Sequence, residues 1–106
     1  MATLKENPTL PELQQYIKEI CKERGWDKNN YLEIFLLFTE EVGELAKAMR
    51  KQANLYNEQE KNNTFHLAEE FADVFSYLLD LANYFDINIE QAFRDKDKIN
   101  ANRKWD

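Results

Sequence analysis

The sequence predicts an all-α fold in which four helices form a bundle. Four segments place apolar residues at three- and four-residue intervals, the period of a helix with one buried face. Two glycines and two prolines in 106 residues leave little material for a turn-rich β fold. Hydrophobic residues make up 43% of the chain, enough for residues 1–106 to form a single domain with its own core.

The first two helices are bounded by recognisable start and stop signals. The first begins after Asn7-Pro8 with Thr9 as its cap, and Gly25 marks its end. Its apolar positions recur at helical spacing: Leu13, Tyr16, Ile17, Ile20 and Cys21. The second helix follows a polar stretch at 27–30 and runs from about Tyr31 to Lys51.

The second half of the chain repeats this organisation. Residues 53–63 are polar and rich in asparagine, so we expect a loop. Thr64 can cap a third helix that runs to about Phe85. After a turn at 86–88, Asn88 caps the fourth helix, with Gln91 in the capping-box position, and this helix runs to about Lys104.

Charge and composition narrow the possible partners. The chain has 14 basic and 20 acidic residues, a net charge of −6, which argues against binding to a nucleic-acid polymer or an acidic membrane. One cysteine, Cys21, and one histidine, His66, exclude a disulfide framework and a structural zinc site within one chain. The chain shows no signal-peptide pattern and no apolar run of about 18 residues, so we expect a cytoplasmic protein.

Carboxylates gather beside the apolar stripes of the two central helices. Glu40, Glu41 and Glu44 fall within an arc of about 100° on the second helix. Glu70 and Asp73, three apart, repeat this layout on the third. Packing these helices together would bring like charges close and raise their pKa values. A divalent cation removes the conflict, and oxygen ligands suit Mg²⁺, with Mn²⁺ as a substitute.

Gly43 lies within the second helix beside these carboxylates. Glycine in a helix costs about 1 kcal/mol relative to alanine, which suggests that another group approaches the backbone closely there. Acidic residues at helical spacing are, however, commonly part of a solvated surface. The residues alone leave a metal site and a surface cluster about equally open.

The fourth helix carries a complementary set of donors. Lys96, Asn100 and Arg103 lie at i, i+4 and i+7 of this helix, within about 60° of one another. Upstream, Ile89 and Phe93 make the same face apolar. The first half of this face could pack on the bundle while the second half contacts phosphate oxygens. Alternatively, these are surface cations placed favourably at a helix C-terminus.

Taken together, these motifs resemble the MazG-like family of all-α nucleoside triphosphate pyrophosphohydrolases. The family pattern is ExxE, a variable gap, ExxD and a later K…N..R. The chain matches it at Glu41 with Glu44, Glu70 with Asp73, and Lys96 with Asn100 and Arg103. The flanking strings EEVGELAKA, AEEFADVFSYLLDLA and DINIEQAF are also similar, and the resemblance covers roughly residues 9–105.

The resemblance implies Mg²⁺-dependent attack of water between the α and β phosphates, which releases nucleoside monophosphate and pyrophosphate. It implies that the metal is held by Glu41, Glu44, Glu70 and Asp73 and the phosphates by Lys96, Asn100 and Arg103. The water would be oriented or deprotonated by Glu40 or by one of the metal ligands, Glu44 among them. Family members of this length are usually oligomers with sites between bundles, which implies a homodimer or homotetramer.

The base pocket is less clearly marked. The stretch KERGW resembles members that prefer dCTP, in which a tryptophan at the position of Trp26 stacks on the base. Such stacking is worth about 1–3 kcal/mol. A second tryptophan of those members is absent, with Lys51 near its place, and Ile17 stands near the position of a missing histidine. Trp26 is therefore either a base-binding residue, for dCTP or a modified dNTP, or a core or loop anchor.

Three other classes of protein share part of this pattern. A helical regulatory or binding protein could keep the fold, self-associate and lack turnover, although it would not need all seven motif residues. A ferritin-like di-iron protein needs ExxH histidines on two helices, and His66 cannot supply both. A dUTPase or a phosphoribosyl-ATP pyrophosphohydrolase would share the metal site and differ in the base pocket.

Overall fold

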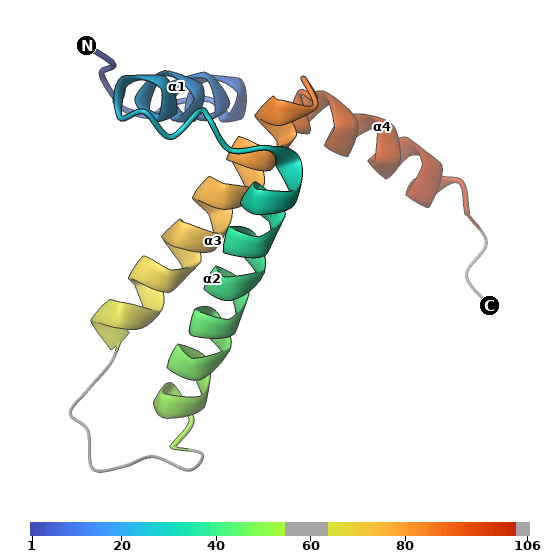
Figure 1. Cartoon of the computed structure of the whole chain (residues 1–106). Coiled ribbons are helices and arrows are strands. Elements are labelled where there is room, and N and C mark those ends of the chain that lie inside the picture. Colours follow the sequence, from blue (N-terminus) through green and yellow to red (C-terminus); the bar gives the residue numbers. More distant parts are fainter. Residues whose placement is uncertain (55–63, 104–106) are drawn as a thin grey trace.

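The computed structural model describes residues 1–54 and 64–103, and four helices lie in these ranges (Figure 1). No strand occurs among the described residues, so the predicted all-α fold is confirmed. None of the helices in these ranges is long and apolar enough to cross a membrane. The helices are α1 (Leu10–Glu23), α2 (Tyr31–Gln52), α3 (Thr64–Tyr84) and α4 (Ile89–Ala101).

Reciprocal capping boxes fix the starts of α1 and α2. The Thr9 hydroxyl accepts from the Glu12 backbone N–H at 3.3 Å, and the Thr9 N–H donates to the Glu12 carboxylate at 2.8 Å. Asn30 and Glu33 make the same exchange at 3.0 and 2.9 Å. A cap of this kind is worth about 1 kcal/mol. Gly25, at φ +72°, lies just beyond the end of α1, as its sequence position predicts.

Two details predicted for the fourth helix are wrong. Asn88 does cap α4 by accepting from the Gln91 N–H at 3.0 Å, but the Gln91 side chain donates to Asp95 at 2.9 Å instead of returning to the cap. The fourth helix also ends at Ala101 rather than near Lys104. Of the predicted loop, only residues 53 and 54 are described, and the rest lies outside the described residues.

α2 and α3 lie side by side as an antiparallel hairpin, and α1 crosses near the end of α3 (Figure 1). Among the described helices, α2 and α3 share by far the most extensive contact. Few side chains are well buried among the described residues: Leu79 is 1% exposed and Ile34 4%, and Cys21, Ala48 and Ala82 are also buried. The chain thus has a narrow core along the hairpin and under α1.

A buried glutamine joins α1 to the α3–α4 junction. The Gln14 side-chain amide donates to the Asn83 side chain at 3.1 Å and to the Ile87 carbonyl at 2.5 Å. Its oxygen accepts from the Ile89 N–H at 3.0 Å, and Asn83 donates back to the Gln14 carbonyl at 2.9 Å. These bonds satisfy buried polar groups and set the direction in which α4 leaves the hairpin. α4 then extends away from it (Figure 1).

Large apolar side chains remain exposed along the hairpin and α4. Leu36 and Phe93 are each 71% exposed. Phe35, Phe71, Phe75 and Tyr84 are exposed as well. Apolar surface of this extent is typical of a protein that buries it against another molecule.

Candidate active site

Three carboxylates converge where α2 packs on α3. Glu41 comes from α2, and Glu70 and Asp73 lie one turn apart on α3. One carboxylate oxygen of each lies within 4.8 Å of the others. The i, i+3 spacing places Glu70 and Asp73 on one helix face, and the hairpin brings Glu41 opposite them.

Burial and the neighbouring negative charges make it unfavourable for these carboxylates to be ionised without a bound cation. Glu70 Oε2 is buried and has no hydrogen-bond partner in the described part of the chain. Partial burial raises the pKa of Glu41, and the charges of Asp73 and Glu70 raise it further. An orphaned buried oxygen with two carboxylates beside it fits a hard divalent cation such as Mg²⁺ or Mn²⁺. We name Glu41, Glu70 and Asp73 the acidic triad.

The two other predicted glutamates lie at the margin of the triad. Glu40 and Glu44 are exposed, and neither belongs to the group within 4.8 Å. Their charges still contribute to raising the pKa of Glu41. At Gly43, a Cβ would meet nothing within 4 Å, so the close neighbour expected there is not found among the described residues.

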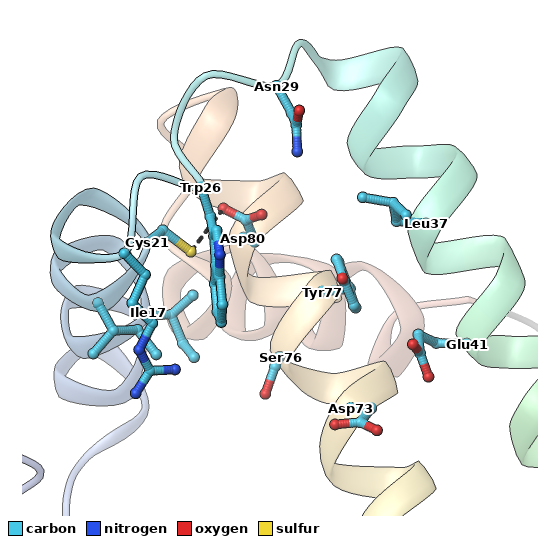
Figure 2. Close-up of a pocket in the computed structure, with 12 residues that line it drawn as sticks. Ile17, Cys21, Trp26, Asn29, Leu37, Glu41, Asp73, Ser76, Tyr77 and Asp80 are labelled. Carbon is cyan, nitrogen blue, oxygen red and sulfur yellow. Dashed lines mark hydrogen bonds between the residues drawn. The ribbon is translucent and has the colours of Figure 1, made fainter.

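A pocket of about 440 Å³ extends from the triad toward α1. Glu41 and Asp73 line one end, and Cys21, Trp26 and Asp80 line the other (Figure 2). The apolar part of its wall includes Ile17, Ile20 and Leu37. A hollow with clustered charge at one end and an aromatic ring at the other suits a ligand that has one charged and one planar part.

Trp26 lies in the loop between α1 and α2 at the border of this pocket. Its side chain is 53% exposed, which excludes a role as a core anchor. The Arg24 guanidinium lies 5.1 Å from the centre of its ring, and the Trp26 backbone N–H donates to the Cys21 carbonyl at 2.8 Å. The residue is thus tied to the end of α1 through its backbone while the ring borders the cavity.

The predicted phosphate-binding residues are not part of this pocket. Lys96 is exposed on α4, Asn100 is half-buried, and Arg103 lies beyond the end of the helix. The common face expected for all three therefore fails at Arg103, because α4 stops at Ala101. α4 contacts α1 and leads away from the hairpin, so one chain does not bring these residues to its own triad (Figure 1).

The structure adds pocket residues that the sequence analysis missed. Tyr77 and Asp80 follow Asp73 at i+4 and i+7, so all three share a face of α3. This spacing was a signal from which both could have been found. Burial raises the pKa of Tyr77, and the charge of Glu41 raises it further, so its phenol remains a hydrogen-bond donor at neutral pH. Asn29, from the loop before α2, also lines the pocket.

Comparisons with known proteins place the chain in a family. The family model of the MazG nucleotide pyrophosphohydrolase domain matches residues 29–104. The crystal structure of iMazG from Vibrio DAT 722 is similar, with a TM-score of 0.65 and 30% sequence identity over 91% of this chain and 100% of that chain. No curated protein matches at a significant level. On the strength of the domain match, the chain belongs to the MazG nucleotide pyrophosphohydrolase family.

Proposed function

We propose that this protein hydrolyses nucleoside triphosphates between the α and β phosphates in a Mg²⁺-dependent reaction, giving nucleoside monophosphate and pyrophosphate. The observation that carries the proposal is the acidic triad at one end of a pocket that has Trp26 at its other end. The triphosphate would lie toward the triad and the base toward the tryptophan. The protein would act on the cytoplasmic nucleotide pool.

Each triad residue has a role in this proposal. Glu41, Glu70 and Asp73 hold the cation. The buried Oε2 of Glu70 is available as a ligand, because it accepts no hydrogen bond from the described residues. Bound Mg²⁺, or Mn²⁺ in its place, would neutralise phosphate oxygens and the charge developing on the leaving pyrophosphate. Glu44 lies one turn beyond Glu41 and is exposed, which suits a carboxylate that completes the ligand set or accepts a proton from water. Glu40 is the alternative base.

The cations of α4 require a second copy of the chain in this proposal. The protein would be a homodimer or homotetramer in which exposed residues such as Leu36 and Phe71 are buried between copies. The partner's α4 would then supply Lys96, Asn100 and Arg103 to the phosphates. Two observations support this arrangement: α4 leads away from its own hairpin, and the hairpin leaves an apolar surface uncovered.

The test is hydrolysis of a panel of canonical and modified ribo- and deoxynucleoside triphosphates, dCTP included, with Mg²⁺ or with EDTA. Chromatography separates the products. Glu70→Gln keeps the shape of the side chain and removes its charge, so activity should be lost. Glu69→Gln is the matched control, because Glu69 is an exposed neighbour on α3 that pairs with His66 at 3.5 Å outside the triad.

Each outcome has a definite meaning. Monophosphate and pyrophosphate that disappear with EDTA and with Glu70→Gln, but persist with Glu69→Gln, support the proposal. Nucleoside diphosphate and orthophosphate as products would show cleavage between the β and γ phosphates and contradict the proposed bond. Mg²⁺ binding without turnover of any nucleotide would favour a non-catalytic regulatory protein. Light scattering on the same samples gives the oligomeric state.

A further inference from the structure

The end of the pocket away from the acidic triad contains a carboxylate to which the proposed reaction gives no role. Asp80 lies on α3, two turns beyond Asp73, and its side chain is half-buried. Figure 2 shows it beside Trp26 and Cys21, with Asn29 on the side of the pocket nearer α2. If the triphosphate lies at the triad, this end receives the nucleobase.

The partner of Asp80 is a hydrogen-bond donor and not a cation. The Cys21 thiol donates to Asp80 Oδ1 at a sulfur–oxygen distance of 3.7 Å. Burial, and then the charge of Asp80, raise the pKa of Cys21 to about 11, so the thiol keeps its proton at neutral pH. Among the described residues, this is the one hydrogen bond that the carboxylate accepts, so Oδ2 remains available for a ligand.

A half-buried carboxylate with a free oxygen favours a ligand that brings its own donor. Leaving such an acceptor opposite another acceptor costs the lost hydrogen bond and adds electrostatic repulsion. Nucleobases differ in the donors that they offer. Cytosine and adenine carry an amino group, a donor, at the ring position where uracil and thymine have a keto oxygen, an acceptor, beside an N–H at N3; guanine carries its amino group at C2.

We propose that Asp80 selects the base, accepting a hydrogen bond from an exocyclic amino group of a nucleobase stacked on Trp26. The site then prefers amino-bearing bases over uracil and thymine. Asn29 lines the same end of the pocket and can donate its side-chain amide to a ring nitrogen or carbonyl of the base. Cys21 is a positioning residue, since its thiol donates to Asp80 and holds that carboxylate in place. This assignment rests on the proposed nucleotide function.

The sharpest comparison is dCTP against dUTP, whose bases differ in this amino or keto group and at the adjacent N3, an acceptor in cytosine and an N–H donor in uracil. We expect the wild-type protein to favour dCTP in kcat/KM by about 10- to 100-fold, the usual value of one well-placed base contact. Asp80→Asn replaces one acceptor oxygen with a donor and should reduce or invert this ratio. Asp86→Asn is the matched control, because Asp86 lies in the turn after α3, outside the pocket, at φ 55°, which asparagine also tolerates.

A binding measurement separates this proposal from the proposed reaction. In a Trp105→Phe background, Trp26 is the one remaining tryptophan, so its fluorescence can report dCMP and dUMP binding without turnover. Tighter binding of dCMP by the wild-type pocket, lost in Asp80→Asn, supports the assignment even if no triphosphate is cleaved. Hydrolysis of triphosphates with equal use of dCTP and dUTP, with a preference for dUTP, or with a ratio that Asp80→Asn leaves unchanged would overturn it.

Discussion

The two ends of the pocket present the same chemical group in contrasting surroundings. At the triad, Glu41, Glu70 and Asp73 face one another, and Glu70 Oε2 has no donor in the described part of the chain. At the other end, Asp80 stands apart from these carboxylates and accepts from the Cys21 thiol. The difference shows that neighbours decide what a carboxylate binds: several together need a cation, whereas one with a neutral donor can accept from an uncharged ligand.

The largest expected effect is on the rate of hydrolysis, and it distinguishes the roles of the two ends of the pocket. Glu41→Gln removes a cation ligand and should reduce hydrolysis of every nucleotide by about 100-fold or more. Asp80→Asn should change the ratio between dCTP and dUTP instead, and leave the Mg²⁺ dependence intact. Steady-state kinetics on both substrates over a Mg²⁺ titration test this contrast. A uniform loss from both variants would show that the two ends do not act separately.

The reactivity of Cys21 tests whether Asp80 has a neutral partner. A buried thiol with a pKa of about 11, against an ordinary value of 9.0, should form thiolate about 100-fold less readily near neutral pH. Alkylation by iodoacetamide at pH 8, followed by mass spectrometry, measures this rate, and the urea-unfolded chain is the reference. Equal alkylation rates in the folded and unfolded chains would show that the Cys21 thiol is not protected and would contradict its role as a neutral donor to Asp80.

The triad should destabilise the metal-free protein, whereas Asp80 should not respond to metal. Glu70→Gln relieves the repulsion at the triad, and a gain of about 1 kcal/mol corresponds to a rise in Tm of about 4–8 °C for a domain of this size. The same variant should lose most of the Tm increase that Mg²⁺ gives the wild type. Thermal unfolding with Mg²⁺ and with EDTA tests both effects. A lower Tm for Glu70→Gln in EDTA would contradict the assignment.

The smallest expected effect is on the pH dependence of folding stability. Carboxylates at both ends of the pocket should change the stability in the same direction with pH, but only the contribution of the triad should respond to metal. Burial raises the folded-state pKa of Glu41 above 4.5 and that of Asp80 above 3.8, so the folded protein binds these protons more tightly than the unfolded chain. The associated stability is present at low pH and is lost as pH rises through the folded-state pKa values. Added Mg²⁺ should oppose the loss due to Glu41 and leave that due to Asp80.

Chemical denaturation between pH 4 and 7, with and without Mg²⁺, measures these contributions. Glu41→Gln should remove the Mg²⁺-sensitive part of the pH dependence, and Asp80→Asn the Mg²⁺-insensitive part. If both variants removed the same part, the two carboxylates would be coupled, and the contrast between the ends of the pocket would not hold.

Much of the local structure was determined by the sequence, since capping and helical period act over short distances. Thr9 and Asn88 lie at the helix starts where their chemistry predicts caps. The shared face of Glu70 and Asp73 follows from three-residue spacing on one helix. The ends of helices were less predictable, because no single residue forces α4 to stop at Ala101 rather than near Lys104.

Tertiary structure alone decided which of these side chains meet. The alignment of α2 on α3 brings Glu41, rather than Glu44, within 4.8 Å of Glu70 and Asp73, and helical spacing on separate helices cannot specify that alignment. Cys21 meets Asp80 across 59 positions because α1 crosses α3. The hydrogen bonds of Gln14 likewise direct α4 away from the hairpin. Spacing along a helix fixes a side chain's face, whereas packing between helices fixes its neighbours.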